Sequence, residues 1–159
     1  MSDELALQMR LGMRRLASGV SVITARDDAE NRFAMTASSV TSVSDTPPSL
    51  LVCIHSETRI GGAIAKTGVL GVNVLSRKQR EISVTCAIPE VETSRFDCGE
   101  WQVDPVSGLS FLEGAQSVFL CEIAKIVPYG THNIFVGNIK KVILYGEVDP
   151  LVYCDGIYR

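Results

Sequence analysis

The chain has 159 residues, of which 46% are hydrophobic and 21% charged, and its formal net charge is −3. This length predicts a single domain, residues 1–159, that buries a core of its own. A charge so close to neutral gives no general attraction for nucleic acid, and the composition is typical of an ordered globular protein.

Membrane, secretory and metal-binding classes are not indicated. No apolar run reaches the length of a membrane span, and Met1 to Glu4 lack the apolar core of a signal peptide, so we expect a cytoplasmic protein. The five cysteines are an odd number without a Cys-x-x-Cys pair, which favours reduced thiols over disulfides. With only two histidines, we expect no metal site.

The first predicted elements are a helix and a hairpin. Residues 3–17 have the spacing of an amphipathic helix, whose apolar positions are Leu5, Leu7, Met9, Leu11, Met13 and Leu16. Arg14 and Arg15 lie off that face, and they are either solvated or close to a bound phosphate. Residues 20–25 are rich in β-formers, and a polar turn at 27–31 predicts a hairpin over residues 20–44.

The stretch from Phe33 to Ile54 predicts two strands joined by a turn at Pro47-Pro48. The first strand carries small hydroxyl residues, namely Thr36, Ser38, Ser39, Thr41, Ser42 and Ser44. The second, Leu50 to Ile54, is continuously apolar, which predicts burial on both faces. A strand lined with small side chains leaves room for a flat polar ligand, whose edge the hydroxyls and amides can bond.

Helices and strands then alternate up to a long hairpin. Residues 56–68 predict a short helix with Ser56 or Thr58 as N-cap. These residues either only cap the helix, or the helix start also binds a phosphate. Residues 69–75 predict a strand in which Asn73 must find partners, and Ser76 begins a helix to about Ala87.

The last third of the chain predicts mostly strands. Residues 89–110 look irregular, and strands follow at about 117–127, 133–145 and 151–153. The sum is a mainly β fold, an antiparallel barrel with peripheral helices.

Several short pieces of this sequence recur in one order in a known family. They are Met35-Thr36-Ala37-Ser38-Ser39, Ser42-Val43-Ser44, Pro47-Pro48, Val52-Cys53-Ile54 and Gly156-Ile157-Tyr158. Together they resemble the flavin reductase-like family, and within it the reductase components of 4-hydroxyphenylacetate and chlorophenol monooxygenases. The resemblance implies an FMN-binding split β-barrel and covers the chain from about Gly19 to Tyr158. The family most often has Asn where this chain has Ser38, and a hydroxyl offers fewer bonds than an amide.

The resemblance also implies which residues form the site. It assigns flavin contacts to Met35, Thr36, Ala37, Ser38, Ser39, Ser42, Cys53, Ile54, Ser56, Thr58, Asn73, Arg95 and Phe96. Of these, Ser56, Thr58 and Arg95 would hold the phosphate. His132 would lie on the open face where the nicotinamide arrives, and a turn histidine that bonds backbone is the alternative. Trp101 is expected to pack its loop down rather than stack on a cofactor, and the resemblance places the aromatic ring of Tyr158 at the edge of the site.

The function implied by the resemblance is an NAD(P)H:flavin oxidoreductase that supplies reduced flavin to a partner monooxygenase, as a homodimer. The choices between FMN and FAD, and between NADH and NADPH, stay open. One alternative is a flavin-binding or flavin-sensing module of the same fold without reductase activity, and another is a flavin-free scaffold. The sequence has no Gly-x-Gly-x-x-Gly, P-loop or Gly-x-Ser-x-Gly motif, so other common cofactor and nucleophile sites are not indicated.

Overall fold

A computed structural model describes residues 2–89 and 92–159 of the chain. Its helices are α1 (Ser2–Met13), α2 (Arg59–Thr67) and α3 (Arg80–Ala87), with 3-10 turns η1 (Arg77–Gln79) and η2 (Glu92–Asp97). Its strands are β1 (Ser18–Gly19), β2 (Ser21–Arg26), β3 (Arg32–Ala37), β4 (Thr41–Asp45), β5 (Pro48–His55), β6 (Val69–Val74), β7 (Trp101–Val103), β8 (Ser110–Leu112), β9 (Ser117–Tyr129), β10 (His132–Leu144), β11 (Val152–Cys154) and β12 (Ile157–Tyr158). None of the described helices has both the length and the apolar composition that crossing a bilayer requires.

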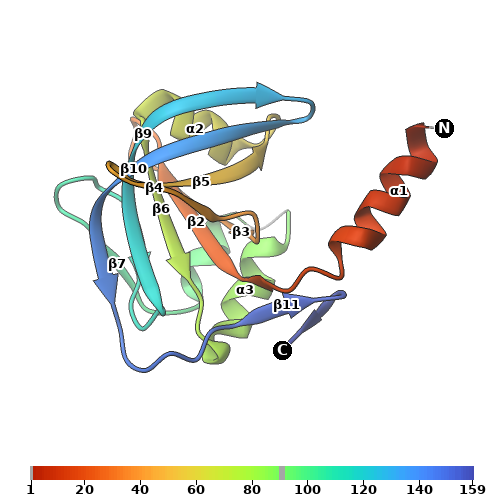
Figure 1. Ribbon diagram of the computed structural model, residues 1–159. Coiled ribbons are helices and arrows are strands. Elements are labelled where there is room, and N and C mark those ends of the chain that lie inside the picture. Colours follow the sequence, from red (N-terminus) through yellow and green to blue (C-terminus); the bar gives the residue numbers. More distant parts are fainter. Residues whose placement is uncertain (1, 90–91) are drawn as a thin grey trace.

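A seven-stranded antiparallel sheet, in the order β3-β2-β6-β9-β10-β5-β4, forms the body of the protein. It curls without closing, as Figure 1 shows, so the predicted split barrel with peripheral helices is confirmed. Its two edges, β3 and β4, follow one another in sequence but pair with different neighbours, β2 and β5. The prediction of one strand running through Ser44 is therefore wrong. Ala37 lies opposite Ser21, the first residue of β2, and beyond it the chain crosses to the other edge.

Apolar side chains fill both faces of this sheet. On one face, Ile60 and Ile64 of α2 belong to the same buried cluster as Phe135 of β10. On the other face, α3 and β8 contribute to a second cluster. Since β2 lies between the two, Val22 belongs to one cluster and Ile23 to the other, which explains why the strand is buried along its length.

Two segments differ from their predictions. The strand at 50–54 is fully buried on one face only, since Leu51 and Cys53 are half-buried beside the exposed edge strand β4. Residues 89–110, predicted irregular, contain β7, which pairs with β8, and Trp101 in β7 packs on Phe96 with ring centroids 4.8 Å apart. The part of that prediction at 90–91 lies outside the described residues. The long hairpin predicted near the C-terminus is confirmed as β9 and β10.

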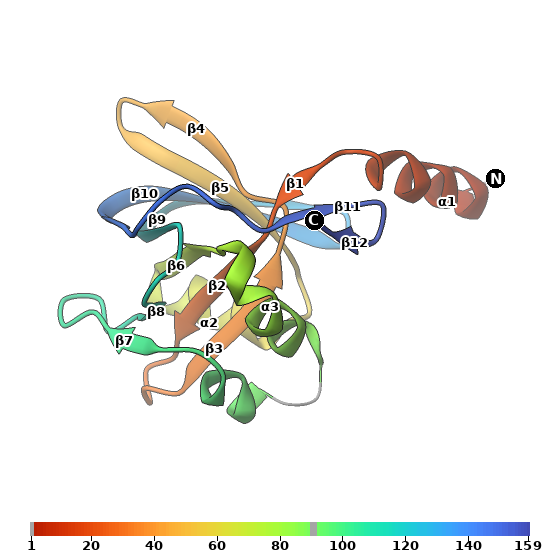
Figure 2. The same cartoon turned by 90° about the horizontal axis from the view of Figure 1, so that it is seen from below.

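The N-terminal helix is shorter than predicted, and none of its twelve residues is buried. After α1 the chain joins the C-terminal hairpin: the Asp155 N–H donates to the Arg14 carbonyl (2.7 Å), and β1 pairs with β11. These contacts replace further helical turns. Figures 1 and 2 show α1 standing away from the barrel on the side of that hairpin.

Candidate functional site

The candidate site begins at residues 38–40, which cross from β3 to β4. Ser38 and Ser39 are exposed there. The Ser39 hydroxyl donates to the carbonyl oxygen of Cys53 (3.0 Å) and accepts from the Cys53 N–H (3.2 Å), which fastens the crossing to β5. Within the described part of the chain, nothing accepts a hydrogen bond from the backbone N–H of Ser38 or Ser39. Two amides are therefore available to a ligand.

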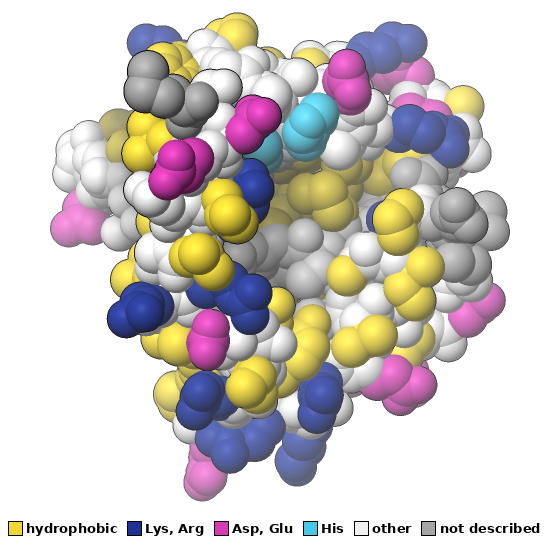
Figure 3. All heavy atoms as spheres, turned by 90° about the vertical axis from the view of Figure 1, so that its right-hand side faces the viewer, with side chains coloured by type: hydrophobic (Ala, Val, Ile, Leu, Met, Phe, Trp, Pro, Cys, Tyr) yellow, Lys and Arg dark blue, Asp and Glu magenta, His cyan; other side chains and the backbone are white. Residues whose placement is uncertain are grey.

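A hollow of about 310 Å³ lies beside this crossing. Its lining consists of Val20, Thr36, Ala37, Ser38, Ala87, Tyr153, Gly156 and Tyr158. Figure 3 looks at this side of the molecule and shows a concave face with hydrophobic side chains in and around it. One wall is held by two bonds: the Thr36 hydroxyl donates to the Ser83 carbonyl (2.6 Å), and the Ser83 hydroxyl bonds that of Tyr158 (2.8 Å). A small, mostly apolar pocket with a few polar groups suits a flat ring with a polar edge.

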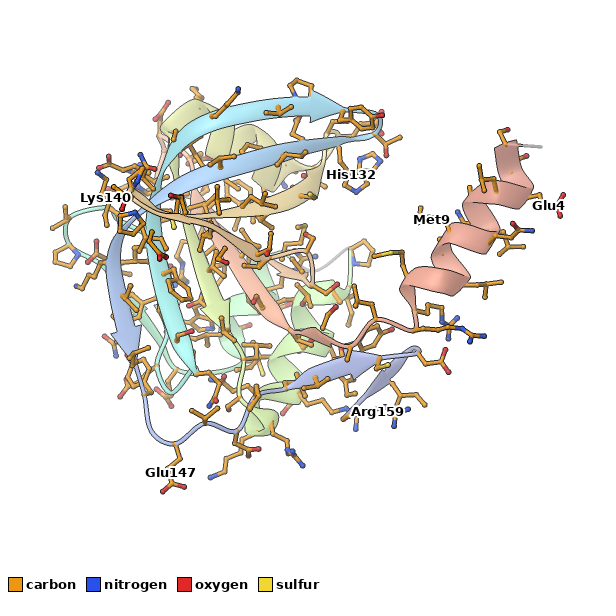
Figure 4. The ribbon with its side chains drawn as sticks, in the orientation of Figure 1. Glu4, Met9, His132, Lys140, Glu147 and Arg159 are labelled. Atoms are coloured by element: carbon orange, nitrogen blue, oxygen red, sulfur yellow. The ribbon has the colours of Figure 1, made fainter. Side chains whose placement is uncertain are left out.

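Two histidines stand at the rim of the same concave face (Figure 3). His132 lies opposite His55 in the pairing of β10 with β5, and their ring centroids are 5.2 Å apart in an edge-to-face arrangement. Nδ1 of His132 lies 2.9 Å from the Thr131 hydroxyl, while Nδ1 of His55 accepts from the Glu57 N–H (3.2 Å). Figure 4 shows His132 projecting from the end of the β9–β10 hairpin into the space that faces α1. Both histidines are exposed, although neither lines the hollow itself.

The start of α2 lies just behind these histidines. Thr58 is the N-cap, since its hydroxyl accepts from the Gly61 N–H (3.2 Å) and donates to the His55 carbonyl (2.9 Å). Ser56 instead donates to the Thr131 carbonyl (3.1 Å) and ties this loop to the β9–β10 turn. Both hydroxyls are in use, and most backbone N–H groups of this segment also donate within the loop and the first turn of α2. A phosphate here would have to compete with these bonds, so the predicted contacts of Ser56 and Thr58 stay a prediction.

Two of the predicted flavin contacts lie inside the core. The Asn73 side chain is fully buried: its NH₂ group donates to the Val22 carbonyl (2.9 Å) and its oxygen accepts from the Leu112 N–H (2.8 Å). This is a satisfied bridge between strands. Ile54 is 1% exposed and belongs to the cluster that includes α2. Neither side chain lines the hollow.

The predicted phosphate contact from Arg95 finds no support in the geometry. Arg95 is 7% exposed, and its guanidinium donates to the backbone carbonyls of Ala34 and Ile88. Phe96 packs on Trp101, and η2, which contains Arg95 and Phe96, packs against β3 and α3. A phosphate would have to displace backbone partners, and this contact stays a prediction.

The other predicted contacts flank the crossing. Met35 is half-buried against the cluster that includes α2, and Cys53 is half-buried beside Ser39. Ser42 is exposed on β4. The structure therefore brings Thr36, Ala37 and Ser38 together around the hollow, with Ser39 and Cys53 next to them.

Two tyrosines complete the hollow. Tyr158 was expected at the edge of the site from the resemblance, whereas Tyr153 was not among the predicted contacts. Tyr153 and Tyr158 face each other across the β11–β12 pairing, with ring centroids 5.2 Å apart. The Gly156-Ile157-Tyr158 piece was a usable signal for Tyr158. Nothing local singles out Tyr153, which reaches the hollow only because β11 pairs with β12.

Comparison with known proteins gives one consistent answer. The family described as "Flavin reductase like domain" matches residues 13–159. The reductase component of the FADH(2)-dependent resorcinol hydroxylase of a Rhizobium species is 35% identical over 150 residues, which are 94% of this chain and 83% of that protein. The FMN reductase (NADH) RutF of Pseudomonas syringae is 33% identical over 153 residues, covering 96% of this chain and 85% of that protein.

A solved structure agrees with these sequence matches. The NADH:FAD oxidoreductase of Streptomyces globisporus, in complex with NAD and FAD fragments, superimposes with a TM-score of 0.89 at 26% identity. The superposition covers 97% of this chain and 91% of that chain.

Proposed function

We infer the function from one premise: this chain belongs to the flavin reductase like domain family. We propose that it is an NAD(P)H:flavin oxidoreductase that reduces FMN or FAD and supplies the reduced flavin to a partner monooxygenase. The name of one relative, an FMN reductase (NADH), supports the proposed flavin reduction. The name of another, the reductase component of a hydroxylase, supports the proposed supply of reduced flavin to a monooxygenase. We also propose that it acts in the cytoplasm, where its five free cysteines would stay reduced.

One observation carries the proposal: Thr36, Ala37 and Ser38 line a hollow, and the two histidines of the chain stand at the rim of the concave face on that side of the molecule. The residues present fit a flavin. Small side chains leave a flat wall, and the free amides of Ser38 and Ser39 suit the polar edge of the ring.

A bound flavin supplies the redox chemistry by accepting a hydride from the nicotinamide, so the chain needs no acid, base or nucleophile of its own. Its residues bind and orient. The amides of Ser38 and Ser39 would donate to the ring edge, and Tyr158, which bonds the Ser83 hydroxyl, bounds the pocket. Ser56 and Thr58 at the start of α2 would lie near the phosphate, which would compete for the bonds they now make. His132 would orient the nicotinamide on the open side.

The activity is tested by following NADH oxidation by absorbance with FMN and with FAD, and again with NADPH. We expect oxidation that requires added flavin, with one flavin and one nicotinamide preferred. Supply of reduced flavin is tested by adding an FADH₂-dependent hydroxylase, which should turn over only with the chain, flavin and NADH all present. A protein that binds flavin but oxidises neither nicotinamide would be a binding module, contrary to the proposal.

The role of His132 is tested by His132→Ala. We expect the KM for the nicotinamide to rise about tenfold, while the Kd for flavin changes less than about twofold. His55→Ala removes the neighbouring imidazole and is the matched control. An unchanged KM in His132→Ala, or an equal rise in both variants, would exclude a specific role for His132.

We further propose a homodimer held through α1. The apolar side chains of this helix and its C-terminal extension are each at least 50% exposed, namely Leu5, Leu7, Met9, Leu11, Met13 and Leu16. A hollow of about 400 Å³ between α1 and the barrel shares Ser38 and Tyr153 with the candidate site. Figure 4 shows Met9 on the side of α1 that faces the barrel. A second copy covering this surface would therefore also close one side of the site.

The charges of α1 favour an antiparallel pair of helices from two copies. Asp3 and Glu4 lie in its first turn and Arg10 in its last, so a twofold axis would set acidic ends against basic ends. By light scattering we expect twice the mass of one chain for the wild type and a single-chain mass for Arg10→Glu. Glu4→Arg combined with Arg10→Glu should restore the pair, and Lys78→Glu is the control. A single-chain wild type would contradict this part of the proposal.

A further inference from the structure

A second hollow, of about 260 Å³, lies on the barrel away from the candidate flavin site and shares no lining residue with it. Its lining includes three apolar side chains, Val69, Val106 and Leu120. It also includes three cationic side chains, Arg26, Lys140 and Lys141. Figure 4 shows Lys140 on the side of the barrel opposite His132. The proposed reductase chemistry uses none of these residues.

A β-bulge brings the two lysines to this hollow. The pairing of β10 with β9 shifts register between Ile139 and Lys141, so Lys140 is the extra residue of the strand. Bulges of this kind redirect side chains. The Lys140 amine lies 3.6 Å from the Glu122 carboxylate, and the Lys141 amine lies 3.2 Å from that of Asp104.

Asp104 is buried and hydrogen-bonds within the loop that borders the hollow. It is 3% exposed, and one carboxylate oxygen accepts from the Ser107 N–H (2.8 Å) and hydroxyl (2.7 Å). Burial alone would raise the pKa of Asp104, but these bonds and Lys141 outweigh it and lower the pKa, so the carboxylate is charged. Three cations then face two carboxylates around the hollow, an excess of one positive charge.

Arg26 has the unused hydrogen-bonding capacity. Its Nε donates to the Ser107 carbonyl (2.6 Å). Gly108, at φ +74°, lets the loop approach this closely, since a Cβ there would meet Nε at 2.7 Å. Among the described residues, nothing accepts a bond from the two terminal nitrogens of Arg26. That outer edge of a guanidinium matches the two oxygens of a carboxylate or phosphate.

We propose that this hollow binds a small organic anion, an oxyanion head on an apolar body, with Arg26 gripping the head and Lys140 and Lys141 adding charge. The walls of Val69, Val106 and Leu120 receive the apolar body. Burial raises the pKa of the Cys121 thiol, which also lines the hollow, to about 12, so no thiolate opposes the anion. The site goes beyond flavin reduction and does not depend on it.

The test is equilibrium dialysis of the full-length protein with phenyl phosphate and with benzoate, in the presence of saturating FMN. We expect saturable binding of one equivalent that FMN does not displace, and at least tenfold weaker binding of benzyl alcohol, which lacks the charge. Arg26→Gln should weaken binding at least tenfold, and Lys140→Gln by less. Arg77→Gln, a surface arginine paired with Asp149, is the matched control and should bind like the wild type.

Several results would overturn the site. They are an absence of binding at roughly 10 mM probe, equal binding by the wild type and Arg26→Gln, or displacement of the probe by FMN. Thermal unfolding of each variant shows that it is folded. Since flavin-dependent NADH oxidation is measured separately, failure of this proposal and failure of the reductase activity are told apart.

Discussion

The helices α1 and α2 both carry apolar side chains, but only those of α2 are covered by its own chain. α2 buries Ile60, Ala63 and Ile64 and packs chiefly on β2, whereas none of the twelve residues of α1 is buried. The connections explain the contrast. A capped turn of three residues joins α2 to β5, while α1 is anchored beyond its C-terminal end, where Arg14 meets the C-terminal hairpin.

This difference shows that an apolar stripe predicts whether a helix is covered but not what covers it. The stripe indicates that a helix will be covered, because exposed apolar area is unfavourable. What covers it depends on how the connection holds the helix. In α2 it is the barrel, and in α1 we propose a second copy of the chain.

The largest expected effect tests this contrast directly. Ile64→Ala removes a fully buried side chain of α2 and should lower the free energy of unfolding by about 2–5 kcal/mol. Leu5→Ala, the matched change in α1, should shift it by less than about 0.5 kcal/mol when the protein is diluted until one chain predominates. Urea denaturation measures both. Equal losses would mean that α1 packs on its own barrel and would break the comparison.

The next effect compares carboxylates of the body with those of α1. Because the folded pKa of Asp104 is lowered, its contribution is present above the unfolded pKa of 3.8 and is lost as pH falls through the lower folded value. Asp104→Asn should lower the free energy of unfolding at pH 7 by about 1–3 kcal/mol and remove part of the acid dependence below pH 3.8. Asp3→Asn in α1 should change neither when the protein is diluted until one chain predominates. An unaltered acid profile in Asp104→Asn would refute the assignment.

Sequence patterns located the elements of the barrel well, since they depend on local periodicity. β2, β6, β9 and β10 each lie close to their predicted ranges. The crossing at 38–40 was missed because nothing local marks it: Phe33 to Ser44 has strand composition throughout. The pairing of β3 with β2 ends where Ala37 lies opposite Ser21, and only there does the chain leave this edge of the sheet.

The candidate site divides in the same way. Small hydroxyl residues suggested room for a flat ligand, and the resemblance assigned flavin contacts to Ser38 and Ser39, whose exposure follows from the crossing. Asn73 and Arg95 fit the resemblance equally well, but tertiary packing turns both inward onto backbone carbonyls. Tyr153 could not be predicted, because its position depends on the pairing of two short strands near the C-terminus.

A smaller effect probes why α2 is held so closely. Thr58→Ala removes the hydroxyl that accepts from the Gly61 N–H and should cost about 0.5–2 kcal/mol of stability. Ser56→Ala, two residues earlier, removes only an exposed bond to the Thr131 carbonyl and should cost less than about 0.5 kcal/mol. Thermal unfolding of both variants compares them. A larger loss for Ser56→Ala would show that the β9–β10 turn, rather than the cap, fixes the helix.

The smallest effect concerns the anchor of α1. Arg14 and Asp155 form an exposed ion pair, with Nε 3.5 Å from the carboxylate and side chains 52% and 65% exposed, so the pair should be worth less than about 1 kcal/mol. Asp155→Asn keeps a residue that tolerates φ +52° and removes the charge. Tryptic cleavage after Arg14 or Arg15 should quicken about twofold to threefold at low salt and hardly at high salt. A much larger increase would mean that this pair, and not a second copy, keeps α1 in place, and the contrast with α2 would then be one of degree.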